Sequence, residues 1–286
     1  AARKRDEEKA ALEKRLAEAD AERRKQQAVP IVIVKPTEEE RKRRYDEELA
    51  GWEAVQASTT DEPLQDYLLR YPSGRFSELA QVQLDRVLAR QGEKKIRVAS
   101  DQANPYSKGT GVLDLDYKVG DRYTFRNVDL LTGIEGNPYR ETVVDLTDLE
   151  VLYNRGIRRD YLGNLHVDRR GRPRAPTQTH IAEYALGKRW STRAENTTLN
   201  GTHYVVELDC RVVARERITV PAGTFDAFRI ESRGFGNFPR YTMFFENRFW
   251  MAPERLRRQV AGESLWRRGS RLVNTTRQEL VGFREK

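Results

Sequence analysis

Residues 215–231 read RERITVPAGTFDAFRIE, two alternating polar and apolar runs on either side of a Pro-Ala-Gly bend. Ile218 and Val220 face one side of an extended strand before the bend, and Phe225 resumes the pattern after it. Pro221 and Gly223 suit a tight turn, because one fixes the backbone φ angle and the other leaves it free. The stretch therefore predicts a β-hairpin, and nothing in it is chemically reactive.

The same two-residue period marks most of the chain after residue 112, with turn residues between the runs and no helical pattern separating them. Many short strands at hairpin spacing favour an antiparallel, twisted sheet that closes as a β-sandwich or partial β-barrel. The expected strands are 121–128, 140–146, 150–154, 164–168, 203–213, 216–220, 225–232, 241–251, 257–261 and 270–283.

Before residue 112 the apolar period changes to that of a helix. Thr37 followed by Glu40 is a capping-box pattern, and Trp52, Tyr67 and Phe76 are expected core anchors of three short amphipathic helices. The fold class is therefore α+β, a charged helix and small helical bundle followed by the antiparallel β domain. The expected parts are a helical stalk at 1–28, an extended linker at 29–36, the bundle at 37–92, a linker at 93–111 and the β domain at 112–286.

Composition limits how much of the chain packs into a core. Charged residues make up 34% of it, hydrophobic residues 38%, and the net charge is +8. The stretch 211–286 holds 16 Lys and Arg against 8 Asp and Glu, so the surplus belongs to the end of the β domain. A basic, arginine-rich surface is compatible with phosphate or carboxylate partners and equally with an ordinary soluble domain of high pI.

Residues with catalytic or metal-binding chemistry are sparse. The single cysteine, Cys210, lies in an alternating strand with no loop to expose it, so we expect a packed thiol rather than a nucleophile. His166, His180 and His203 lack the close spacing of a metal site. The sequence predicts no enzyme, no cofactor and no metal, and no run of apolar residues long enough for a transmembrane helix.

Two residue sets are candidates for binding. An anion would be bound by the arginines of the 169–174 loop and by two arginines near the C-terminus, whereas a partner protein would contact aromatic side chains of the sheet. The anion candidates are Arg169, Arg170, Arg172, Arg174, Arg257 and Arg258. The contact candidates are Tyr241, Phe244, Trp250 and Trp266, provided that they lie outside the core. Specific nucleic-acid recognition is disfavoured, since no groove-binding helix or stacking platform is evident.

The sequence carries two family resemblances. The landmarks VGDRYTF at 119–125, GKRW at 187–190, VPAGTFDAF at 220–228 and WMAPE at 250–254 resemble a bacterial β-domain of unknown function, often exported or in lipoproteins, over residues ~112–286. ELAGWEAV at 48–55 and YLLRYPSGRFSELA at 67–80 resemble the helical segment that follows the protease domain of bacterial caspase-like proteins, over ~48–88. Neither resemblance implies a catalytic residue in this chain.

These observations lead to one expected function and two alternatives. We expect a non-catalytic binding or scaffolding module of the bacterial cell envelope, periplasmic or otherwise extracytoplasmic, with the stalk as spacer and a protein or anionic envelope component as partner. The alternatives are the regulatory C-terminal tail of a caspase-like cysteine peptidase and a polyanion-binding module. Because residue 1 falls within a helical pattern, we also expect a longer parent protein.

Overall fold

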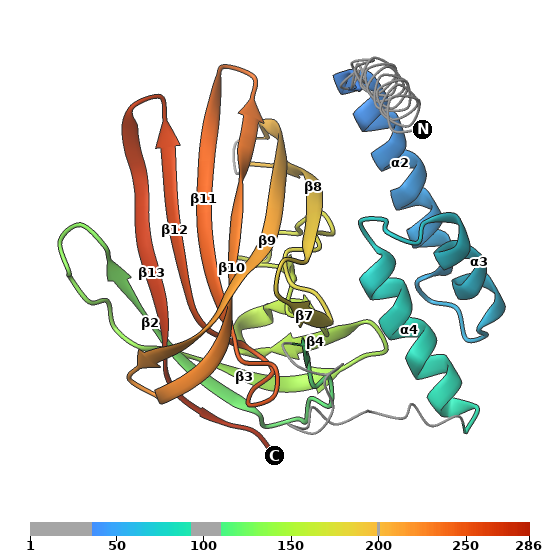
Figure 1. The fold of residues 1–286 in the computed structure, drawn as a ribbon, viewed down its shortest axis with the longest axis horizontal. Helices are drawn as coiled ribbons and strands as arrows, with labels where there is room; N and C mark the ends of the chain where they lie inside the picture. Colours follow the sequence, from blue (N-terminus) through green and yellow to red (C-terminus); the bar gives the residue numbers. More distant parts are fainter. Residues whose placement is uncertain (1–35, 93–109, 199–200) are drawn as a thin grey trace, which may run out of the picture. The chain divides into compact units, whose positions relative to one another are not determined.

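A computed structural model describes residues 36–92, 110–198 and 201–286 (Figure 1). The expected stalk at 1–28 lies outside the described residues, as do all but the last residues of the linkers at 29–36 and 93–111. Within the described part, Arg44–Lys286 form one compact unit. None of the helices described is long and apolar enough to cross a membrane.

Three helices appear where the periodicity predicts them, α2 at Glu38–Val55, α3 at Glu62–Arg70 and α4 at Ser77–Arg90. The capping box of α2 is present, because the Glu40 backbone N–H donates to Thr37 Oγ1 (3.2 Å) and the Thr37 N–H donates to the Glu40 carboxylate (2.9 Å). Trp52, Tyr67 and Phe76 are buried, with the Trp52 and Phe76 rings stacked at 6.4 Å. The prediction that these aromatics anchor the core is confirmed.

A buried carboxylate joins α2 to the start of α4. Glu48 is 7% exposed, and its Oε1 accepts hydrogen bonds from the backbone N–H groups of Arg75 and Phe76. Gly74 precedes them with no side chain, and a Cβ there would collide with the Glu48 carboxylate. Burial raises the pKa of Glu48 above its usual value, against the lowering effect of these hydrogen bonds.

The β domain is built on one antiparallel sheet of eleven strands in the order β6-β5-β4-β3-β2-β13-β12-β11-β10-β9-β8. Within this sheet, β2 and β13 are the only described neighbours that are not consecutive strands. A separate two-stranded sheet joins β1 to β7. The bounds are β1 Thr110–Val112, β2 Arg122–Asp129, β3 Tyr139–Leu146, β4 Glu150–Tyr153, β5 Arg158–Asp160, β6 Leu165–Val167, β7 Glu183–Ala185, β8 Arg189–Thr197, β9 His203–Val220, β10 Gly223–Phe238, β11 Tyr241–Met251, β12 Gln259–Arg268 and β13 Arg271–Arg284.

The sheet is open and strongly curved (Figure 1), so the α+β class is confirmed and the partial barrel describes it better than a two-sheet sandwich. One apolar core joins the helices to β8–β11 and includes Leu113, Tyr184 and Phe228. A second lies among β2–β4, β12, β13 and the turn end of the β9–β10 hairpin. The curvature thus lets a single sheet bury apolar side chains in two places.

The turn of the hairpin at residues 215–231 is connected to β13 by a hydrogen bond. The Ala222 N–H in its turn donates to the Leu280 carbonyl of β13 (3.1 Å). The strands expected at 203–213 and 216–220 are one strand, β9, because the pairing with β10 skips Val213 in a β-bulge between them. A bulge bends a strand without ending it, which the polar run at 215–217 concealed.

Charged side chains cover one face of the long strands in a continuous row. Arg126 pairs with Glu279 at 3.1 Å, Arg277 with Glu279 and Glu263 at 2.7 Å each, and Glu263 with Arg248 at 3.1 Å. Cross-strand pairs of opposite charge stabilise neighbouring strands. Glu263 and Glu279 are among the 8 acidic residues already counted in the C-terminal stretch, so these pairs leave its basic surplus unchanged.

Candidate functional site

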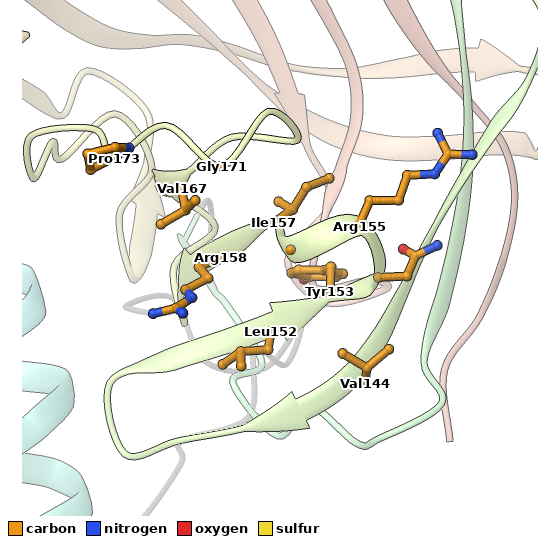
Figure 2. A pocket seen from close by; sticks show the side chains of 11 residues that line it. Val144, Leu152, Tyr153, Arg155, Ile157, Arg158, Val167, Gly171 and Pro173 are labelled. Atoms are coloured by element: carbon orange, nitrogen blue, oxygen red, sulfur yellow. The ribbon is translucent and has the colours of Figure 1, made fainter. Parts of the chain in front are cut away.

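A surface pocket of about 520 Å³ opens on β3–β6 (Figure 2). Alternation along the strands makes its walls, because Val143 and Val151 enter the core while their neighbours Val144 and Leu152 face the pocket. Val144 is 50% exposed. The lining residues are Val144, Leu152, Tyr153, Asn154, Arg155, Gly156, Ile157, Arg158, Val167, Gly171 and Pro173. We call this the β3–β6 pocket.

The turn between β4 and β5 places two arginines at the β3–β6 pocket. Asn154 anchors this turn to β3, accepting from the Thr142 N–H (2.9 Å) and donating to the Arg140 carbonyl (3.2 Å). Arg155 has a φ of 63°, and it is the one non-glycine residue with positive φ in the described part of the chain. A left-handed arginine costs roughly 1–2 kcal/mol, and such strain is concentrated at functional positions.

The charges of these two arginines are weakly compensated. Arg158 lies 3.7 Å from the Glu150 carboxylate, and Arg155 makes no ion pair with any described residue. Figure 2 shows their guanidinium groups at opposite ends of the pocket, with apolar Leu152 and Ile157 between them. The arrangement suits a ligand that has both an apolar part and a negative charge.

The predicted arginine loop forms the rim of the same pocket through Gly171 and Pro173. Asp168 organises it, because its carboxylate pairs with Arg172 (2.5 Å) and Arg174 (3.0 Å) and accepts from the Arg170 N–H (2.9 Å). Burial raises the pKa of Asp168, but the hydrogen bonds from Arg172, Arg170 and Arg174 outweigh it and hold that pKa well below its usual value. Asp168 therefore stays ionised and pairs with two of the four arginines of the loop.

Arg169 and Arg170 remain as the exposed charges of this loop, and neither forms an ion pair among the described residues. Two further arginines, Arg155 and Arg158, line the pocket whose rim this loop forms, and sequence reasoning did not select them. The Asn-Arg-Gly turn signal at 154–156 was visible, but no pattern indicates that its arginine adopts a left-handed conformation beside the 169–174 loop.

The two C-terminal anion candidates lie in the interior. Arg257 pairs with Asp114 (2.8 Å) and Asp121 (2.9 Å), and Arg258 pairs with Glu141 (2.9 Å). Both arginines are less than 10% exposed. They therefore form no part of a solvent-facing basic surface, because each carries a buried carboxylate partner.

The aromatic contact candidates divide into buried and partly exposed side chains. Trp250 is 7% exposed and donates to Glu216 (2.9 Å), so it belongs to the core. Trp266 is 37% exposed and packs edge-on against Phe245. Tyr241 lies in a stack with Phe238 at 4.6 Å on one side and Arg268 at 4.1 Å on the other. Phe244 packs against the exposed Phe235.

Nucleophile and metal chemistry find little support in the described residues. Cys210 is buried, and burial raises the pKa of its thiol to about 11. His166 lies 3.0 Å from Glu150 and 4.0 Å from Asp160 beside a second pocket of about 380 Å³, but no described hydroxyl or thiol is bonded to its ring. No group of three or more His, Cys, Asp or Glu in the described ranges is arranged to hold a metal ion.

Comparison with known proteins gives no family. No family model matches the chain, and no curated protein matches it. Among solved structures, a Bacteroides fragilis protein with a YmcC-like fold, considered to be exported, matches at 13% identity with a TM-score of 0.36. A protein of Parabacteroides distasonis, considered to be a lipoprotein, matches at 13% identity with a TM-score of 0.34. Each match covers 62% of this chain and all of the other. TM-scores this low assign neither fold nor function.

Proposed function

We propose that this chain is a non-catalytic binding module of the bacterial cell envelope whose β3–β6 pocket takes an anionic lipid. The observation that carries the proposal is an apolar pocket with two arginines, Arg155 and Arg158, in its lining and the arginine-rich 169–174 loop on its rim. Arg155, Arg169 and Arg170 lack ion pairs among the described residues, and Arg158 has one weak partner. The acyl chain would contact the apolar walls, and a guanidinium group at one end of the pocket would contact the phosphate.

A lipid fits this site better than a nucleic acid does. Single-stranded nucleic acid is bound on exposed aromatic side chains, and the one aromatic residue that lines the pocket, Tyr153, is 2% exposed. The exposed apolar side chain of Val144 would gain no favourable contact from a charged phosphodiester backbone. An extracytoplasmic location and a role as the tail of a caspase-like peptidase remain predictions, and the sequence upstream of Ala1 tests both.

Vesicle co-sedimentation of the full chain tests the proposal. We expect binding to phosphatidylcholine vesicles that contain phosphatidylglycerol and none to phosphatidylcholine alone. Replacing Arg155, Arg169 and Arg170 by Ala should weaken binding about a hundredfold, since each arginine near an anionic surface contributes about 1 kcal/mol.

The matched control replaces three exposed arginines of β8 and β9, Arg189, Arg211 and Arg217, by Ala. The net charge falls by the same amount, but the pocket is unchanged, so affinity should stay within about threefold of the parent. Equal losses in both variants would reduce the effect to overall charge. Tight binding to single-stranded DNA, unaffected by phosphatidylglycerol, would support the polyanion alternative instead.

A further inference from the structure

A second, smaller cavity of about 40 Å³ lies inside the β domain, apart from the β3–β6 pocket. It contains a charge arrangement that the proposed lipid site does not use. Its walls come from the β5–β6 region, the segment before β7, and strands β11–β13. The lining residues are Arg159, Leu162, Gly163, His180, Met251, Arg257, Arg258, Gln259 and Gln278.

The carboxylates at this cavity are unevenly shared, because Arg257 lies within 4 Å of three of them, Asp114, Asp121 and Glu285. Arg159 and Arg258 share one carboxylate, that of Glu141, at 3.6 Å and 2.9 Å. Arg257 also lines the cavity, but Asp114 and Asp121 compensate it. Arg258 is 5% exposed and the side chain of Arg159 is 18% exposed, so one carboxylate serves two guanidinium groups in a largely water-excluded place, where an unbalanced charge is costly.

Both arginines also have a donor without a partner. Arg258 is 5% exposed, yet its Nη1 is buried without a hydrogen-bond acceptor, and so is the Nε of Arg159. A buried charged donor normally finds an acceptor, because leaving it unmatched costs the full desolvation penalty.

The third polar residue in the wall of this cavity, His180, lies near the positive charges of Arg258 and Arg159. Burial, together with the charges of Arg258 and Arg159, lowers the pKa of His180 to about 3. Its imidazole is therefore neutral at physiological pH and carries one N–H that can donate. The side chains of Gln259 and Gln278, bonded to each other at 2.5 Å, complete the polar wall.

We propose that this cavity binds chloride, held by Arg159, Arg258 and His180. A monatomic anion supplies the missing counter-charge and accepts hydrogen bonds from any direction, so it satisfies donors that converge without a common plane. The size agrees, because one water-sized group needs about 10–15 Å³ of such space and the cavity has room for only two or three.

Thermal unfolding of the full chain tests this at constant ionic strength, with sodium gluconate replaced stepwise by sodium chloride or bromide. We expect a saturable rise in Tm of roughly 5–10 °C once chloride exceeds its Kd about a hundredfold. Crystals soaked in bromide should show an anomalous peak within hydrogen-bond distance of Arg258 Nη1. A Tm that follows ionic strength alone, with no such peak, would mean that only water occupies the cavity.

A variant with a built-in anion separates binding from folding. Gln278→Glu places a carboxylate in the cavity wall, where it can still accept from Gln259, so the protein should fold and its Tm should no longer respond to chloride. Asn237→Asp adds the same charge at an exposed position of β10 and should keep the full response. A chloride response that survives Gln278→Glu, or an equal response to sulfate, would overturn the chloride site.

Discussion

At the scale of single residues, Arg155 combines backbone strain with an uncompensated charge. Asparagine tolerates the left-handed conformation better than arginine does. We therefore expect Arg155→Asn to raise the free energy of unfolding by about 0.5–1 kcal/mol and to weaken binding to anionic vesicles about fivefold. Urea denaturation and vesicle co-sedimentation measure the two effects.

Arg211→Asn is the control for Arg155→Asn, since Arg211 is an exposed arginine in an ordinary strand conformation of β9. It should give no gain in stability and no loss of binding. If Arg155→Asn stabilised the protein and left vesicle binding intact, the strain at this turn would have no connection with the proposed ligand.

Glu48 offers a second residue-scale prediction, on pH. The pKa of Glu48 is raised in the folded state, so the folded protein holds the carboxyl proton more tightly than the unfolded chain does. The stability that this proton contributes is therefore present below the pKa of the unfolded chain and is lost as pH rises through the pKa of the folded protein. Gln at this position keeps an oxygen for the N–H groups of Arg75 and Phe76 without the buried charge. We expect the stability of Glu48→Gln relative to the parent to increase from pH 4 to pH 7.

Chemical denaturation across that pH range measures the Glu48 effect. Glu48→Leu removes the acceptor and should be about 1–3 kcal/mol less stable than Glu48→Gln at every pH, because it leaves two backbone N–H groups unpaired. A difference between Glu48→Gln and the parent that does not change with pH would show that the buried carboxylate does not titrate in this range.

At the scale of elements, local signals predicted what local interactions build. The helices and the capping box at Thr37 followed from short-range patterns, and so did the turn at 221–223. Strands β5 and β7 were missed because three residues are too few to show a period. Strand β8 was missed because Arg193, 1% exposed, occupies a core position that polarity assigns to the surface. Its charge is matched by Glu207 at 2.7 Å on the neighbouring strand.

The β9–β10 turn supports a prediction at this scale. Gly223 has a φ of 130°, and a Cβ there would meet open space, so a side chain at this position changes backbone strain alone. Gly223→Ala should destabilise the protein by about 1–3 kcal/mol in thermal or urea unfolding. Gly282→Ala in β13 is a matched control, because its Cβ also meets open space and its φ is not positive. Equal effects of the two substitutions would mean that the conformation of the turn carries no strain.

At the scale of the whole molecule, the sequence states the net charge of +8 but not which charges are compensated. Arg257 finds Asp114 and Asp121 at separations of 143 and 136 residues, and Arg258 finds Glu141 at 117. Only the sheet topology brings these partners together. The anion site at the 169–174 loop could be predicted because its arginines are neighbours in the sequence. The contribution of Arg155 could not be predicted, because it depends on the tertiary structure.

Asp168 tests this view of the charge distribution, because it neutralises Arg172 and Arg174 beside the proposed lipid pocket. Asp168→Asn keeps the shape of the side chain and removes its charge, so we expect affinity for phosphatidylglycerol vesicles to rise about tenfold and to depend more steeply on salt.

Asp168→Asn should also lower the free energy of unfolding at neutral pH. Since the pKa of Asp168 is depressed in the folded state, its stabilisation is present above the unfolded pKa of about 3.9 and is lost only as pH falls below it. The difference in unfolding free energy between the variant and its parent should therefore shrink on acidification, and weaker vesicle binding by the folded variant would count against the role of these arginines.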